Sequence, residues 1–208
     1  MTDSNSPHLP IFALPKSFPT MSAANTPKNI LLVIGLIVLA AASRLLPHPP
    51  NFVPVGAMAL FGAAALPKQW LAFLVPVLAF YLSDLVLNNT LYAAYFEGFY
   101  WGVSYWTVGA IVLMVLLGSG MLRKLPFSWG RIGGAAVGAT LIFFLLTNFG
   151  VWAGGMMYPK TAAGLLAAYT AGLPFLVSSL LANLMFSGVL FGAARYFGLV
   201  DTRQGVVA

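Results

Sequence analysis

Two charged residues lie next to or within long apolar stretches and are the first candidates for chemistry. Arg44 follows one apolar run, and Asp84 lies in another. A charge inside a membrane span is costly, so it is usually paired or functional. We predict that Arg44 and Asp84 form an ion pair. Two roles stay open for it: the pair fastens two apolar segments together, or it forms the floor of a ligand pocket.

Side chains that could bind a small organic molecule are concentrated in three loops between apolar segments. Aromatic walls with a few fixed polar groups are typical of small-molecule sites. Aromatic belts at membrane interfaces account for part of this enrichment, but not for the asparagines among them. The predicted ligand-binding residues are Arg44, His48, Asn51, Asp84, Asn88, Tyr92, Tyr95, Trp101, Asn148, Trp152 and Tyr158.

The sequence has no pattern that is typical of a catalytic centre. It contains no HExxH, GxSxG or P-loop motif, and no cluster of metal-ligating residues. It has no cysteine, which excludes disulfides and thiolate chemistry. Ser83 and Asp84 are not a dyad, because adjacent helical residues point to different faces. His48 lies between two prolines and is either a rigid-loop residue or a metal ligand. We therefore do not expect an enzyme.

Six apolar segments must position these candidate residues. The 208 residues include only ten Lys or Arg and four Asp or Glu, and the mean hydropathy is +0.91, which excludes a soluble globule. A membrane helix needs about 20 apolar residues, so the second segment is short and the others fit. We expect an all-α fold, a polytopic bundle of six transmembrane helices. The segments are residues 29–46, 52–66, 69–88, 101–122, 132–153 and 172–196.

The basic residues predict the side of the membrane on which each loop lies. With a cytoplasmic N-terminus, eight of the ten Lys and Arg residues are cytoplasmic, and Arg44 and Lys160 are not. Basic residues near helix ends stay in the cytoplasm. We therefore expect a bacterial inner-membrane protein with both termini cytoplasmic and the first, third and fifth loops outside. The basic residues form no cluster on a soluble face, so we expect no nucleic-acid partner.

The two ends of the chain differ from its apolar centre. Residues 1–28 are polar and proline-rich, which predicts a disordered cytoplasmic tail. The transmembrane domain would cover residues 29–197, and residues 198–208 would form a short cytoplasmic tail. Two alternatives stay open: Met21 is the true start, or the first segment is a signal peptide cleaved before Ser43. The remaining five segments keep the same orientation in each case.

Small residues recur four positions apart in three of the segments. Such strips allow the backbones of two membrane helices to approach closely. They serve either internal packing or the docking of another membrane subunit. The strips are Gly130, Gly134 and Gly138; Gly188 and Gly192; and Ala59 and Ala63.

Two further features concern the course of the helices. Pro76 is expected to kink the third segment. Residues 161–169 are predicted to form a separate short helix at the outer interface.

The six-segment pattern, with ligand-type residues in alternate loops, resembles the membrane-embedded substrate-binding (S) components of energy-coupling factor (ECF) transporters. The stretches 44–56, 83–84 and 147–150 also resemble an uncharacterised bacterial membrane family related to these components. Its nearest functional relatives are the solitary uptake proteins for cobalamin (vitamin B12). The resemblance covers residues 29–197. It implies an ECF S-component-like fold and the uptake of a small organic micronutrient, with cobalamin as one such ligand.

Two departures from that family concern the partner and the ligand. Members that use a shared coupling subunit carry an Ala-xxx-Ala strip on the first segment, and residues 31–39 have none. This favours a solitary mode or a different docking face. The cysteine that holds cobalt in some members is absent, which leaves His48 as the alternative axial ligand. The alternative function is a structural or assembly protein that docks another membrane subunit through its glycine strips.

Overall fold

Apolar runs form the helices of the computed structural model, which describes residues 20–21, 26–123, 125–155 and 157–201. Four of the six described α-helices begin at hydroxyl-bearing caps. Thr26, Ser104, Ser128 and Thr161 each accept a hydrogen bond from a backbone N–H three residues on, which begins a helix. The helices are α1 (Pro27–Ala42), α2 (Val55–Ala65), α3 (Gln69–Asn89), α4 (Tyr105–Met121), α5 (Trp129–Gly154) and α6 (Ala162–Tyr196), with two 3-10 turns, η1 (Ser43–Leu45) and η2 (Ala93–Tyr95).

Four of the described helical segments are long and apolar enough to cross a membrane: α1 with η1, α3, α5 and α6. The chain is thus an integral membrane protein built from helices, as predicted. The other two helices are shorter, with 17 residues in α4 and 11 in α2. At 1.5 Å per residue, α2 is roughly 16 Å long, about half the hydrocarbon thickness of a bilayer.

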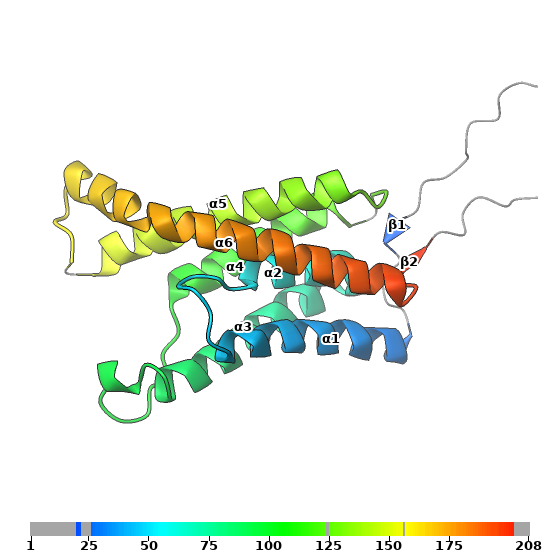
Figure 1. The fold of residues 1–208 in the computed structure, drawn as a ribbon, viewed down its shortest axis with the longest axis horizontal. Coiled ribbons are helices and arrows are strands. Elements are labelled where there is room, and N and C mark those ends of the chain that lie inside the picture. The colour runs from blue at the N-terminus through cyan, green and yellow to red at the C-terminus, as the bar shows by residue number, and fades with distance from the viewer. Residues whose placement is uncertain (1–19, 22–25, 124, 156, 202–208) are drawn as a thin grey trace, which may run out of the picture.

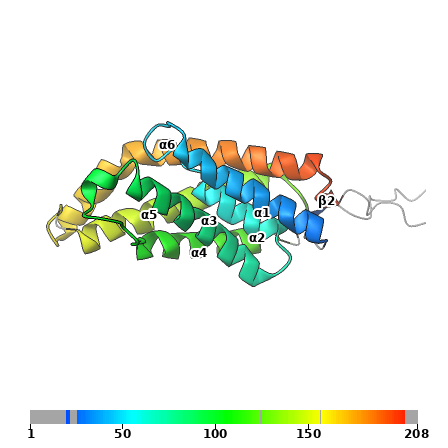
Figure 2. The same ribbon diagram turned by 90° about the horizontal axis from the view of Figure 1, so that it is seen from below.

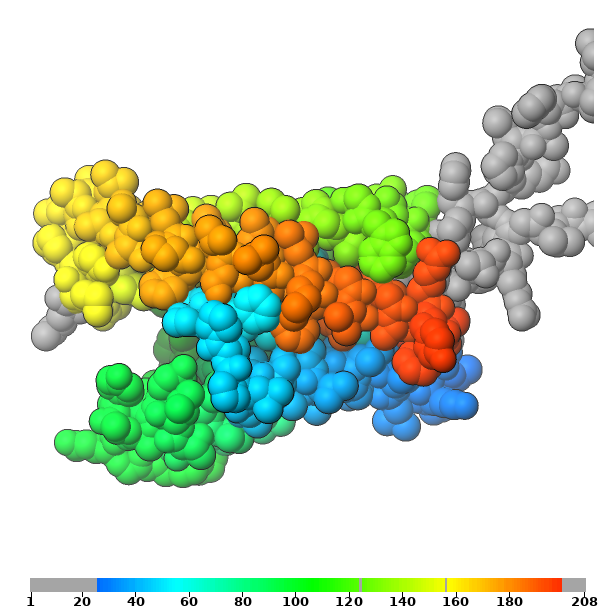
Figure 3. Space-filling model, in the orientation of Figure 1, coloured from blue at the N-terminus to red at the C-terminus, as the bar shows by residue number. Residues whose placement is uncertain are grey.

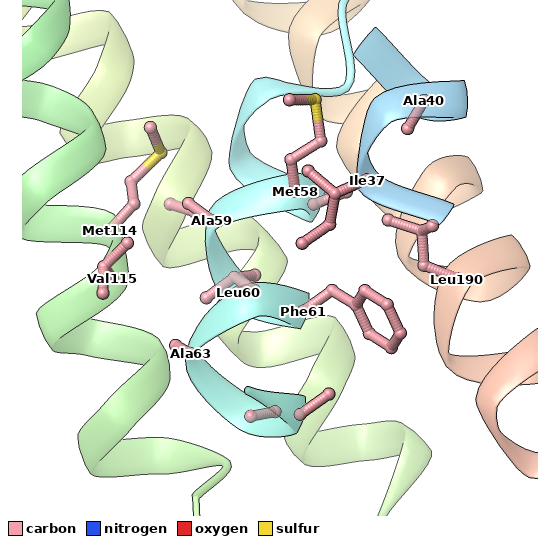
Figure 4. Close-up of a cluster of buried hydrophobic side chains, with 14 of the residues drawn as sticks. Ile37, Ala40, Met58, Ala59, Leu60, Phe61, Ala63, Met114, Val115 and Leu190 are labelled. Atoms are coloured by element: carbon pink, nitrogen blue, oxygen red, sulfur yellow. The ribbon is translucent and has the colours of Figure 1, made fainter. Parts of the chain in front are cut away.

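The short helix α2 lies at the centre of the molecule, and all eleven of its residues are buried. It packs against α1, α3, α4, α5 and α6, and Figure 4 shows its side chains pointing toward several of them. The sequence allows this because the helix has no polar side chain and consists mostly of alanine and glycine. Gly118 of α4 fits so closely that an added Cβ would lie 2.9 Å from the Cβ of Ala63 and 3.1 Å from the Cα of Leu60.

The helices run back and forth, so alternate loops lie at opposite ends of the bundle (Figure 1). The start of α1 and the end of α6 share one end. There β1 (Thr20–Met21) pairs antiparallel with β2 (Val200–Asp201). The other end, which we call the loop end, carries residues 90–104 and the α5–α6 connection, and residues 46–54 lie set back from it toward the middle of the molecule (Figure 1). Figure 3 shows the loop end hollowed between two arms, one made of α5 and α6 and the other of the end of α3 with the segment that follows.

Two predictions about the chain's ends and interface are revised. The separate helix over residues 161–169 is wrong, because α6 runs without a break from Ala162 to Tyr196 and passes through Pro174. In the tail predicted to be disordered, Thr20 and Met21 form the strand β1, and Pro27 already begins α1. The remainder of that tail, residues 1–19 and 22–25, and residues 202–208 of the second tail lie outside the described residues.

The contact between α4 and α2 gives a first prediction. Gly118→Ala places a methyl group against the Leu60 backbone, which cannot move aside, so we expect a loss of about 1–3 kcal/mol in unfolding free energy. Gly120→Ala is the matched control on the same helix, since an added Cβ there meets no atom within 4 Å. Thermal unfolding in detergent, followed by circular dichroism, measures both. Equal midpoints for the two variants would contradict the close packing.

Candidate functional site

A cavity of about 380 Å³ lies between α5 and α6, on the side of the loop end. Asn51, in the segment between η1 and α2, and Thr107, in the first turn of α4, complete its wall. Its apolar side chains include three phenylalanines, and its polar ones are uncharged. We call it the α5–α6 cavity. It is lined by Asn51, Thr107, Phe143, Phe144, Thr147, Asn148, Val151, Met157, Tyr158, Ala168, Ala171, Gly172, Phe175, Leu176 and Ser179.

Helical spacing on α5 and α6 brings these residues together. On α5, Phe144, Asn148 and Val151 follow one another at intervals of four and three, so they share one face. On α6, Gly172 lies opposite Asn148, and a Cβ at Gly172 would lie 2.5 Å from the Asn148 Oδ1 atom. The absence of a side chain at Gly172 therefore leaves room for the Asn148 amide.

Three polar groups of the wall donate to backbone carbonyls. The Thr147 hydroxyl donates to the Phe143 carbonyl at 2.7 Å, and Asn148 Nδ2 donates to the Phe144 carbonyl at 2.8 Å. The Ser179 hydroxyl donates to the Asn51 carbonyl at 3.0 Å. That last bond ties the segment before α2 to α6, and Figures 1 and 2 both show this segment passing close to α6.

A buried polar network lies one helical turn beyond Ser179. Asn183 is 1% exposed, and its Oδ1 atom accepts the Ala57 N–H of α2 at 3.2 Å. Its Nδ2 atom donates at 2.9 Å to the Thr140 hydroxyl of α5, which donates to the Ala136 carbonyl. The amide thus satisfies an N–H in the first turn of α2, where helices lack internal partners. It also joins α2, α5 and α6 beside the cavity.

The predicted ion pair between Arg44 and Asp84 is confirmed. Arg44 Nη2 lies 2.5 Å from Asp84 Oδ1, and the two side chains are 8% and 22% exposed. Arg44 Nη1 also donates to the Ser83 hydroxyl and to the Phe80 carbonyl, and the guanidinium lies over the Phe80 ring at 4.2 Å. Neither Arg44 nor Asp84 lines the α5–α6 cavity. Of the two predicted roles, the geometry favours the fastening of η1 to α3.

Removing either side of this ion pair should lower stability to different extents. Arg44→Met leaves the carboxylate without its cation, so we expect a loss of about 3 kcal/mol in unfolding free energy. Asp84→Asn keeps an oxygen acceptor for Arg44 and should cost about 1 kcal/mol. Thermal unfolding in detergent measures both.

The reciprocal exchange of the two residues should not restore stability fully, because position 84 cannot reproduce the contacts of Arg44 with Ser83 and Phe80. Variants as stable as the unmodified chain would contradict the fastening role.

The predicted candidates of the first and third loops, apart from Asn51, lie outside the cavity lining. The His48 ring nitrogens contact the Arg44 and Pro49 carbonyl oxygens at 3.1 and 2.9 Å, so its ring is held by the backbone. Asn88 is half-buried at the end of α3. Tyr92 is exposed, and Tyr95 and Trp101 are 81% and 67% exposed. Such exposure at a helix end fits an aromatic belt at the membrane interface.

Asn89, next to Asn88, holds the third loop in place through side-chain hydrogen bonds to the backbone. Asn89 Nδ2 donates to the Leu85 and Tyr100 carbonyls, and its Oδ1 atom accepts the Tyr100 N–H at 2.7 Å. These bonds close the segment between α3 and α4 on itself.

Trp152 holds the connection between α5 and α6 and does not line the cavity. Its indole N–H donates to the Pro159 carbonyl at 3.0 Å. The Lys160 amine donates to the Trp152 and Gly155 carbonyls and lies 5.7 Å from the Trp152 ring centre. Together these contacts place Tyr158 against the cavity, where the sequence predicted a ligand-binding tyrosine.

Of the predicted candidates, the structure brings Asn51, Asn148 and Tyr158 together in the cavity. Thr107, Thr147, Ser179 and the phenylalanines were not predicted, because they lie within the apolar segments and not in the loops between them. Ser179, Asn183 and Ser187 recur every four residues on α6, but of these three only Ser179 lines the cavity. No three His, Asp or Glu side chains in the described part of the chain lie close enough together to hold a metal ion.

The glycine strips divide between the two roles that the sequence left open. On α5, an added Cβ at Gly138 would lie 3.0 Å from Leu117 of α4, so this end of the strip serves internal packing. On α6, Gly188 and Gly192 meet no atom within 4 Å, and Gly188 is exposed. The α6 strip therefore faces outward from the bundle.

Comparison with known proteins gives a family without an assigned activity. Residues 24–203 match the family of unknown function DUF6580. The chain belongs to this family. No curated protein and no solved structure matches it. The match includes the six helices and the whole lining of the α5–α6 cavity.

Proposed function

We propose that the chain is the substrate-binding part of an uptake system in the bacterial inner membrane, with the α5–α6 cavity as its capture site for a small organic micronutrient. The observation that carries this proposal is the convergence of Asn51, Thr107, Asn148 and Ser179, from four parts of the chain, on one cavity with phenylalanine walls. Concave, mostly apolar sites with a few fixed polar groups are typical of small-molecule binding.

The direction of capture follows from the distribution of basic residues. Lys28, Lys68, Arg123, Arg131 and Arg195 lie near helix ends opposite the loop end. Basic residues stay in the cytoplasm, so the loop end and its cavity face outward and both termini face inward. In this arrangement six helices span the membrane, and the segment before α2 completes the crossing of that short helix. Irregular backbone is tolerated at membrane depth where it is buried or lines a cavity.

Labelling of single cysteines tests this threading, because the chain has no cysteine of its own. Tyr95→Cys lies at the loop end and Leu125→Cys at the opposite end, and both positions are exposed. In intact cells, we expect an impermeant maleimide to label Tyr95→Cys only. Leu125→Cys should be labelled only after the membrane is permeabilised. Labelling of both in intact cells would contradict the arrangement.

The size of the cavity constrains the ligand. A volume of about 380 Å³ is at the lower end of the range of roughly 300–1,000 Å³ for small-molecule sites. A corrinoid is larger than this, so cobalamin would have to occupy the hollow between the two arms as well, and a smaller vitamin fits the cavity itself. With both His48 ring nitrogens against carbonyl oxygens, cobalt ligation by His48 would require its ring to turn.

A second candidate function rests on the outward strip of α6. Gly188 and Gly192 leave a smooth, uncovered surface in the half of α6 away from the cavity. Small residues at this spacing favour contact with another membrane helix. This surface would serve a structural or assembly protein, and equally an uptake component that docks a coupling subunit.

Native mass spectrometry of the gently purified chain tests the capture site. We expect a non-covalently bound small molecule on the unmodified protein. Ala171→Trp fills the cavity from its α6 wall and should abolish that bound mass. Ala167→Trp is the matched control, since it lies one turn away on α6, is exposed and does not line the cavity.

The outcomes separate the two candidate functions. A bound mass lost only in Ala171→Trp supports capture in the α5–α6 cavity. The same masses on all three proteins would contradict it. A protein subunit retained on all three, with no small molecule on any of them, would favour the assembly function instead.

A further inference from the structure

The lining of the α5–α6 cavity carries information about the charge of its ligand. Among the described residues that line the cavity, none is Asp, Glu, Lys, Arg or His. Arg44 pairs with Asp84, and the Lys160 amine, in the connection between α5 and α6, donates to two backbone carbonyls. A charged ligand would therefore lose its hydration without gaining a counter-charge, which is strongly unfavourable in an apolar setting.

The hydrogen bonds of three wall side chains determine which of their own polar groups remain for a ligand. Thr147, Asn148 and Ser179 each use an O–H or N–H to reach a backbone carbonyl. A hydroxyl has one donor and two acceptor sites, and an amide oxygen only accepts. The groups left over on these three side chains are therefore mainly acceptor oxygens. The assignment of the Asn148 amide is fixed by the Phe144 carbonyl, which can only accept, so Oδ1 is the atom turned toward Gly172.

Three of the apolar side chains in the wall are aromatic. Phe143 and Phe144 of α5 and Phe175 of α6 supply ring surfaces, and Phe144 lies beside Tyr169 with ring centres 5.7 Å apart. Aromatic side chains favour stacked or edge-on contacts with another ring.

We propose that the α5–α6 cavity selects an uncharged, ring-bearing molecule with N–H or O–H donors, and that the acceptor oxygens of Asn148, Thr147 and Ser179 receive those donors. This inference rests on the proposed function of the cavity as a ligand site. It adds the chemical class of the ligand: neutral aromatic amides and comparable heterocycles are bound, and carboxylates and ammonium-type cations are rejected.

A matched series of small probes tests the charge and the donors separately. Benzamide is neutral and has N–H donors, N,N-dimethylbenzamide is neutral without them, benzoate is an anion and benzamidinium is a cation. Saturation-transfer NMR with the purified full-length chain in nanodiscs gives their relative affinities. We expect benzamide to bind, and each of the other three to bind roughly tenfold more weakly or worse, since each loses a hydrogen bond or introduces an unpaired charge.

Variants of the wall add a test of the residues. Ala171→Trp should remove benzamide binding, and Ala167→Trp should retain it. Thr147→Val keeps the shape of the side chain without its oxygen and should weaken benzamide by up to about tenfold. Asn148→Asp places a carboxylate in the wall, so benzamidinium should then bind more tightly than benzamide. The preferences for charge and for donors are measured on the unmodified chain alone. Only the assignment of the binding to the cavity depends on Ala171→Trp, and Ala167→Trp is its control for folding.

The possible failures are distinguishable. If benzoate or benzamidinium binds the unmodified chain as well as benzamide, and Ala171→Trp blocks that binding, the cavity is a ligand site but the inferred neutral class is wrong. If N,N-dimethylbenzamide equals benzamide, the role of the acceptor oxygens is wrong. If no probe shows binding that Ala171→Trp blocks, both this inference and the capture site are overturned.

Discussion

The fold depends on the burial of one short helix by all of its neighbours. Every residue of α2 is shielded from solvent, and five helices pack around it. In lipid, association of helices relies on close packing because there is little hydrophobic drive between them. A central helix made mostly of alanine and glycine allows such close packing. Gly118 of α4 adds to it, because the absence of a side chain there lets the backbones of α2 and α4 approach each other. The positions of the surrounding helices, and hence the cavity between α5 and α6, follow from this packing.

Two polar contacts hold parts of the bundle that the central helix alone does not fix. The Arg44–Asp84 pair joins the end of α1 to α3, and the Asn183 amide joins the start of α2 to α5 and α6. They lie in different arms, so each arm has its own polar anchor. The loop end is open between the arms (Figure 3), and at the opposite end Arg123 donates to Gln69 and to the Pro67 carbonyl, which joins the end of α4 to the start of α3.

The sequence predicted the helices and the ion pair because both have strong local or energetic signals. Long apolar runs with few charges can only be membrane helices, and a lone arginine and aspartate in such runs need each other. The cavity could not be predicted in the same way. Thr147 and Ser179 are neutral residues that are common in membrane helices, and only the packing of α5 on α6 makes them neighbours. The length of α2 was also out of reach, since the apolar run begins at Phe52 but the helix begins at Val55.

The unbroken course of α6 has a mechanical consequence. Proline lacks the N–H that would close its turn of the helix, and Pro174 lies between Gly172 and Phe175, two residues of the cavity wall. One turn of the longest helix, beside the cavity, therefore lacks a backbone hydrogen bond. Beyond Pro174, α6 continues without a break to Tyr196 at the far end of the bundle. A small bend of the helix at Pro174 would therefore displace that end of α6 sideways by a larger distance.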